Sequence, residues 1–239
     1  MCTVTWSATS DGYQLVFNRD ERRSRAEALP PQLESSGGTS WLAPRDAEAG
    51  GTWVAVNEHG LTVGLLNLYQ AEAALPSREG KTSRGLLVRA LAGSPDLDAA
   101  AACLLGYDLN LFMPFTLVVA GPDGEVSSFD WDGRQAGGWQ PARAPIVSSG
   151  HDVVGATAAR RQLFAGFGQH PDLADLLAFH ASHEPAKGAY SPCMHRADAK
   201  TVSLTAVRVS RGVVEMAYAA GSPCRTALGP WQQLARSPK

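Results

Sequence analysis

"CTVTWSATSDGYQLVFNRDE", residues 2–21, is the stretch that decides the fold. Polar and apolar residues alternate from Cys2 to Ala8, and a second apolar run, "YQLVFN", follows Asp11-Gly12. An Asp-Gly pair between two such runs is a strong hairpin signal. If these two residues form the turn, Cys2 pairs with Glu21. The charged residues 18–21 then lie beside the amino terminus.

This register also predicts which side chains share a face of the sheet. Arg19 and Glu21 fall on the face of Cys2, whereas Asn18 and Asp20 point to the opposite face. A shift of one residue would exchange the two faces. The proximity of charged groups to Cys2 holds in either case.

Cys2 follows the initiator methionine, so removal of Met1 would leave a thiol and a free α-amine on one residue. Their reference pKa values are roughly 8.5 and 7.7–8, both near working pH. One residue could therefore supply a nucleophile and its own general base. A nearby arginine favours the thiolate, and a carboxylate can orient the amine. The alternative is a chance Met-Cys start beside an exposed charged turn.

The composition indicates one globular domain over residues 1–239. The chain carries a net charge of −2 and 44% hydrophobic residues, which is ample for a packed core. Scattered arginines and near-neutral charge argue against a nucleic-acid partner. We expect a cytoplasmic protein, because no basic segment followed by an apolar stretch begins the chain and no run of ~18 apolar residues predicts a membrane span. No cofactor is expected.

The four cysteines, Cys2, Cys103, Cys193 and Cys224, share no CxxC spacing, and nothing suggests a disulfide framework. Cys193 and His195 could supply two zinc ligands. No second ligand pair stands at a useful spacing, so the sequence argues against a metal site.

Further hairpins and helix pairs follow along the chain. Gly50-Gly51 before Trp53 reads as a tight turn, because the stretch lacks the lysine of a phosphate-binding loop. Residues 25–52 read as a long surface loop. The order predicts an α+β fold with antiparallel sheet and segregated helices. The expected strands are 52–57, 61–66, 114–121, 125–131, 144–149, 200–209 and 213–220, and the expected helices are 83–93, 97–105 (N-capped by Ser94), 157–167 and 171–181.

Five ordered motifs carry a resemblance that spans essentially the whole chain: "MC" at the start, "FNRDE" (17–21), "APRD" (43–46), "GGTWVAVNEHG" (50–60) and "GLLN" (64–67). Together they resemble the NRDE-domain family, also called the transport and Golgi organisation 2 family, with a weaker match at residues 193–207. That family is similar to N-terminal nucleophile (Ntn) hydrolases of the penicillin V acylase and bile-salt hydrolase branch. The resemblance implies a four-layer αββα sandwich, with two antiparallel sheets flanked by helix pairs.

The resemblance also implies roles for individual residues. Cys2 would be the nucleophile and base, Arg19 and Asp20 its charged neighbours, and Asn67 an oxyanion donor. The supporting or substrate-binding residues would be Asn18, Glu21, Ser149, Gly150, His151, Arg196 and Lys200.

Two positions depart from the family pattern. Ser148, Ser149 and Gly150 stand where related proteins tend to carry an asparagine, and a serine hydroxyl or the Gly150 amide could substitute for it. Lys200 stands at a position that is usually arginine, with Arg196 close by. His195, beside Cys193, is a further candidate to face the site.

The first hypothesis is therefore a cysteine Ntn hydrolase that cleaves a linear, non-peptide amide. The second is a non-catalytic protein of the same fold that handles or traffics a lipid or haem. A redox role for the Cys2 thiol is a third, weaker reading. The expected partner is a small-molecule amide or lipid-like ligand, and the oligomeric state stays open.

Overall fold

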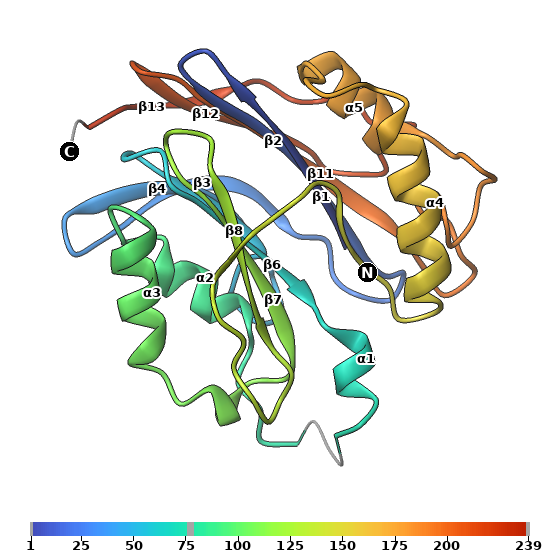
Figure 1. The fold of residues 1–239 in the computed structure, drawn as a ribbon, viewed down its shortest axis with the longest axis horizontal. Coiled ribbons are helices and arrows are strands. Elements are labelled where there is room, and N and C mark those ends of the chain that lie inside the picture. The colour runs from blue at the N-terminus through green and yellow to red at the C-terminus, as the bar shows by residue number, and fades with distance from the viewer. Residues whose placement is uncertain (1, 76–78, 238–239) are drawn as a thin grey trace.

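Two antiparallel sheets form the centre of the protein, in a computed structural model that describes residues 2–75 and 79–237 (Figure 1). Met1, whose removal the sequence predicts, lies outside the described residues. The first sheet has the strand order β10 (Ile146–Ser148), β1 (Cys2–Thr9), β2 (Gly12–Arg22), β11 (Ala199–Val209), β12 (Val213–Ala219), β13 (Gln232–Ala235). The second has the order β3 (Leu29–Ser36), β4 (Thr39–Arg45), β5 (Val54–Asn57), β6 (Thr62–Asn67), β7 (Phe115–Ala120), β8 (Val126–Trp131), β9 (Gln140–Pro141).

Helices cover the outer faces of both sheets. α4 (Val153–Ala165) and α5 (Leu173–Ala181) lie on the first sheet, and α2 (Gly85–Leu91) and α3 (Leu97–Leu105) lie on the second. The short α1 (Tyr69–Glu72) follows β6, and a 3₁₀ turn, η1 (Leu109–Leu111), precedes β7. Of the helices in the described ranges, none has the length and apolar character needed to cross a membrane.

Three hydrophobic cores correspond to the three interfaces of a four-layer stack. One lies between the two sheets, where Phe17 and Val4 pack with Val54 and Leu66. A second lies under α2 and α3, and a third joins Val16 to Leu176 of α5. Alternating residues of β2 thus face different cores, as the period of a strand requires. The α+β fold with two antiparallel sheets flanked by helix pairs is confirmed.

The first hairpin forms, but its predicted register is wrong by two residues. Thr9 pairs with Gly12, so Ser10 and Asp11 make the turn and Cys2 pairs with Arg19, not Glu21. Gly12 belongs to the strand, and β11 approaches it closely: a Cβ there would lie 2.0 Å from the Val209 carbonyl oxygen. A shift of two leaves the faces unchanged, so Arg19 and Glu21 share the face of Cys2 as predicted.

The prediction of a loop over residues 25–52 is wrong, because β3 and β4 form a hairpin there. Gly37 and Gly38, both with positive φ, make its turn. β3 is an edge strand, so Pro30 and Pro31 can lie in it without removing a hydrogen bond between two central strands. Leu33 in the same strand is 64% exposed. Its composition therefore resembles a loop. The other hairpins and the four longer helices lie where expected, although Asp96, not Ser94, caps α3.

Candidate functional site

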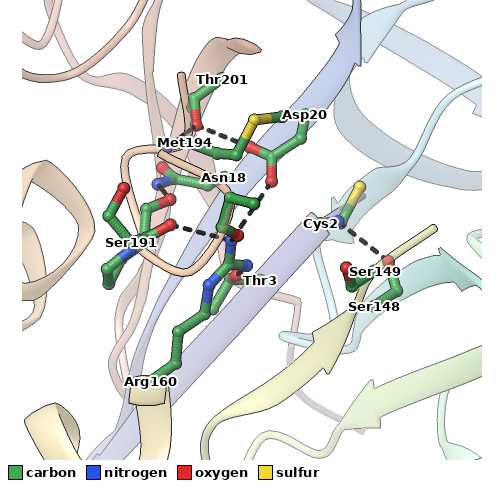
Figure 2. A network of polar contacts seen from close by, with 12 residues as sticks. Cys2, Thr3, Asn18, Asp20, Ser148, Ser149, Arg160, Ser191, Met194 and Thr201 are labelled. Carbon is green, nitrogen blue, oxygen red and sulfur yellow. Dashed lines mark hydrogen bonds and ion pairs between the residues drawn. The ribbon is translucent and has the colours of Figure 1, made fainter. Parts of the chain in front are cut away.

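Cys2 lies at the start of β1, between β10 and β2, and borders a cavity of about 580 Å³. Its backbone nitrogen donates a hydrogen bond of 2.9 Å to Ser148 Oγ of β10 (Figure 2). The residue is 9% exposed. The sulfur therefore belongs to the wall of a cavity and not to the open surface.

Arg19 is the cross-strand partner of Cys2, and its guanidinium is held from two sides. It lies 4.3 Å from the centroid of the Trp53 ring and forms an ion pair with Asp46. Arg25 binds the same carboxylate with two hydrogen bonds of 3.0 Å. Burial alone would raise the pKa of Asp46, but the Arg25 and Ala49 hydrogen bonds and the charge of Arg19 hold it below its usual value. Asp46 and Trp53 thus fix a cation beside Cys2.

The surroundings of Cys2 act on its thiol in opposite directions. Burial raises the pKa of the thiol, and the Asp20 carboxylate raises it further. The positive charge of the amino terminus, the Asp20 backbone N–H and the Arg19 charge lower it by less, so the net pKa lies above the ordinary value. Arg19 lowers the pKa of the thiol, as the sequence led us to expect, but burial raises that pKa by more.

Asp20 borders the cavity, but its carboxylate belongs to a buried network of hydrogen bonds and an ion pair (Figure 2). Thr201 Oγ1 donates to it at 2.6 Å and in turn accepts the Met194 N–H at 2.8 Å. Arg160, fully buried on α4, lies 3.8 Å from the same carboxylate. Burial raises the pKa of Asp20 although Arg160 opposes this shift.

Arg160 and Asn18 connect this network to the helices and to the segment before β11. The Arg160 guanidinium donates to Thr3 Oγ1 and, at 2.8 Å, to the Ser191 carbonyl. Asn18 Nδ2 donates to the carbonyls of His180 and Pro192 at 2.8 and 3.0 Å. The side chain of Asn18 thus supports the fold on the face away from the cavity.

Asn67 reaches the cavity from the second sheet. Its Nδ2 donates to the Tyr69 hydroxyl at 2.9 Å. The pKa of Tyr69 is raised to about 12 by burial and by the nearby charge of a Cys2 thiolate. Gly150 also lies against this ring, where an added Cβ would be 3.3 Å from Tyr69 Cδ1. Asn67, Tyr69 and Gly150 therefore form a wall near Cys2, to which the sequence analysis assigned only Asn67 and Gly150.

The remaining predicted site residues divide between the cavity and its surroundings. Glu21 and Arg196 line the cavity. Lys200 pairs with Glu21 across β2 and β11 and borders a separate hollow of about 120 Å³. Ser149 Oγ accepts the His151 N–H at 3.3 Å. Among the described residues, neither Ser149 nor His151 lines the cavity.

Sequence reasoning missed several residues that hold the site together. Asp46, Tyr69 and Thr201 contact Arg19, Asn67 and Asp20 respectively. Ser148, which the sequence suggested only as a substitute for an asparagine, contacts the Cys2 nitrogen. Asp46 ends the motif "APRD", which was a signal available in the sequence. His195 lies beside Cys193 and Cys224 and not in the cavity lining that the structure describes.

The family model described as "Transport and Golgi organisation 2" matches residues 1–141. No curated protein matches the sequence.

Solved structures of three enzymes share the fold. The Caenorhabditis elegans ortholog of N-acylethanolamine-hydrolyzing acid amidase is 12% identical with a TM-score of 0.55, and the match covers 86% of this chain and 92% of that chain. Penicillin V acylase from Agrobacterium tumefaciens is 11% identical with a TM-score of 0.55, covering 98% and 86%. A variant of conjugated bile acid hydrolase from Clostridium perfringens is 12% identical with a TM-score of 0.55, covering 99% and 97%. All three are Ntn-type hydrolases, and the likeness establishes a hydrolase-like fold.

Proposed function

The chain belongs to the Transport and Golgi organisation 2 family, and from this premise we propose that it is a cysteine Ntn hydrolase. It would cleave a linear, non-peptide amide after removal of Met1. The observation that carries the proposal is the position of Cys2 in the cavity wall, with Ser148 Oγ at its nitrogen and Arg19 as its cross-strand partner.

In the proposed reaction, the free α-amine of Cys2 takes the proton of its own thiol. The sulfur then attacks the substrate carbonyl carbon, and the carbonyl oxygen becomes an oxyanion that accepts an N–H of Asn67. The ammonium returns the proton to the leaving nitrogen as the C–N bond breaks. Water, deprotonated by the amine, hydrolyses the thioester, which releases the acid and restores the thiol.

A free amine would also change the balance of effects on the thiol. Ser148 Oγ already accepts one N–H of Cys2 at 2.9 Å, and it can hold the amine in the same place. A positive charge on that nitrogen would favour the thiolate and oppose the effect of burial. Removal of Met1 would therefore move the amino-terminal charge, which lowers the pKa of the Cys2 thiol, onto Cys2 itself.

The cavity fits a small polar substrate. Its volume of about 580 Å³ lies within the range of small-molecule sites. Arg84 and Arg196 line it together with Glu48 and Asp198, while Leu65 offers an apolar surface. This mixture suits an amide with polar or charged substituents.

A panel of acyl amides tests the proposal, with release of amine as the readout. Wild-type protein should hydrolyse at least one member, and Cys2→Ala should lose that hydrolysis while keeping its melting temperature. Cys103→Ser, in which the replaced cysteine lies on α3, should behave like the wild type. Equal activity of the wild-type and Cys2→Ala proteins would refute the nucleophile. We propose that this reaction takes place in the cytoplasm, in a single domain.

One observation favours the second candidate, a binding or trafficking protein without catalysis. Burial raises the pKa of the Cys2 thiol, which suits an unreactive cavity residue. For this candidate, Cys2→Ala protein would bind a lipid or haem ligand with wild-type affinity, and no amide of the panel would be cleaved.

A further inference from the structure

Four side chains that can bind a metal meet next to the first sheet, near the start of β11 and the end of β12. They are His183, Cys193, His195 and Cys224, and their ligand atoms all lie within 4.8 Å of one another. His183 follows α5, Cys193 and His195 precede β11, and Cys224 follows β12. Sequence spacing indicated only the Cys193–His195 pair, because the other two residues come from distant segments.

Two of the distances match those between neighbouring ligands of a tetrahedral zinc ion. Both Cys193 Sγ and Cys224 Sγ lie 3.4 Å from His195 Nε2. Zn–S and Zn–N bonds of about 2.3 and 2.0 Å place neighbouring ligand atoms about 3.3–3.8 Å apart in a tetrahedron. The rings of His183 and His195 meet edge to face, with centroids 5.1 Å apart.

His183 supplies a second, independent observation. Its Nε2 is buried, and no residue in the described ranges forms a hydrogen bond with it. Buried nitrogen atoms of side chains normally have a partner. A metal ion among the four ligands would be that partner.

We propose that His183, Cys193, His195 and Cys224 bind one Zn²⁺ ion as a structural site. Two thiolates and two imidazoles favour Zn²⁺ over Mg²⁺ or Ca²⁺, which prefer oxygen ligands. Four protein ligands leave no open position for a substrate, which is the arrangement of structural sites and not of catalytic ones.

Along residues 191–195, the zinc ligands are interspersed with residues that form hydrogen bonds to the network around Asp20. The carbonyls of Ser191 and Pro192, just before Cys193, accept hydrogen bonds from Arg160 and Asn18. The N–H of Met194, between Cys193 and His195, donates to Thr201. Bound zinc would therefore hold residues 183–195 against β2 and β11.

Cys224 adds the turn after β12 to this anchor. In the same turn, Ser222 Oγ donates to the Thr201 carbonyl at 2.6 Å. One zinc ion would thus join three segments around Thr201, which also holds the Asp20 carboxylate.

The metal content of the full-length protein tests the proposal. Protein purified under reducing conditions is freed of metal with a chelator, reloaded with Zn²⁺, desalted and measured by plasma mass spectrometry. We expect about one zinc per chain, and Co²⁺ in its place should give thiolate-to-cobalt charge-transfer bands. Cys224→Ser and His183→Ala should lose the metal, whereas the matched controls Cys103→Ser, His170→Ala and Cys2→Ser should keep it.

Cys224→His separates loss of a ligand from loss of folding, because it retains four ligands and should keep bound zinc. Hydrogen exchange at residues 188–196 should slow when Zn²⁺ is added to wild-type protein and should not change in His183→Ala. A zinc content near zero in folded, reloaded wild type would overturn the proposal. So would unchanged zinc in Cys224→Ser and His183→Ala, or a Cys193–Cys224 disulfide in the reduced, zinc-loaded protein.

Discussion

Cys2 lies directly opposite Arg19 in the β1–β2 pair, so the proposed nucleophile and a fixed guanidinium share one face of the first sheet. Asp46 and Trp53 hold that guanidinium in place, and Ser148 holds the Cys2 nitrogen from the other neighbouring strand. The next residue of β2, Asp20, points to the opposite face and joins a buried network. One face of β2 thus borders the cavity, and the other face contributes to the buried polar network of Asp20, Thr201 and Arg160.

Alkylation of Cys2 by iodoacetamide should depend on whether Met1 is removed. Insertion of a glutamine between Met1 and Cys2 keeps the methionine and blocks the free amine. In this extended protein, burial keeps the thiol pKa raised. Its alkylation rate should be low at pH 7 and should rise about tenfold per pH unit. This rise should continue above about pH 8.5, where an ordinary thiol levels off.

In the processed protein, the α-ammonium should shift this rise to lower pH. Peptide mapping assigns the label to Cys2 and not to Cys103, Cys193 or Cys224. Identical pH profiles for the two proteins would show that the amine does not act on the thiol.

Asn67→Ala should lower kcat by about 10²–10³, because a lost oxyanion donor costs about 2.7–4 kcal/mol in the transition state. KM should change little, because the oxyanion forms only after the substrate has bound. Steady-state kinetics on the best amide of the panel measures both constants. Tyr69→Phe keeps Asn67 but removes its hydrogen-bond partner, so its effect should be smaller. A kcat within twofold of wild type for Asn67→Ala would remove this residue from the mechanism.

Asp46→Asn should lower the free energy of unfolding by about 2 kcal/mol at pH 7, because charged hydrogen bonds to Arg19 and Arg25 are lost. The folded-state pKa of Asp46 lies below its ordinary value, so its contribution is present above the unfolded-state pKa. The contribution disappears as the carboxyl is protonated in the folded state. Urea unfolding from pH 7 to pH 3 should therefore show a difference from wild type that shrinks below about pH 4.

Asp98→Asn serves as the control for this series, because Asp98 is an exposed residue of α3. Its stability should stay within about 0.5 kcal/mol of wild type. A wild-type minus Asp46→Asn difference that stays constant down to pH 3 would contradict the ion pairs described for Asp46.

Arg160→Met should destabilise the protein by about 3–5 kcal/mol, because it leaves the buried Asp20 carboxylate without its cation. Arg161→Met, one residue further along α4 and exposed, should change stability by no more than about 0.5 kcal/mol. Chemical denaturation of the two variants gives the comparison. Similar stabilities would mean that the network behind Cys2 contributes little to folding.

The local signals of the sequence were sufficient for the fold and for the neighbourhood of Cys2. Strict alternation over residues 2–8 and the run "FNRDE" place charged groups beside the amino terminus whichever turn forms. Repeated hairpins and helix pairs predict antiparallel sheets with helices on their outer faces. These features depend on neighbours in the chain.

Features that depend on distant segments were missed. Gly12 is one example: its role in the strand depends on β11, whose Val209 carbonyl oxygen would lie 2.0 Å from a Cβ at position 12. Tyr69 reaches the site from α1, and nothing in its local sequence marks it. The raised pKa of Cys2 reflects burial by the whole fold, which charge patterns near residue 20 do not report.

The intact mass of catalytically active protein is the most direct test of the central claim that Cys2 acts as an amino-terminal nucleophile. The protein should lack Met1 and should gain the acyl mass of its substrate when a reaction is quenched in acid. Active protein that retains Met1 would contradict the account.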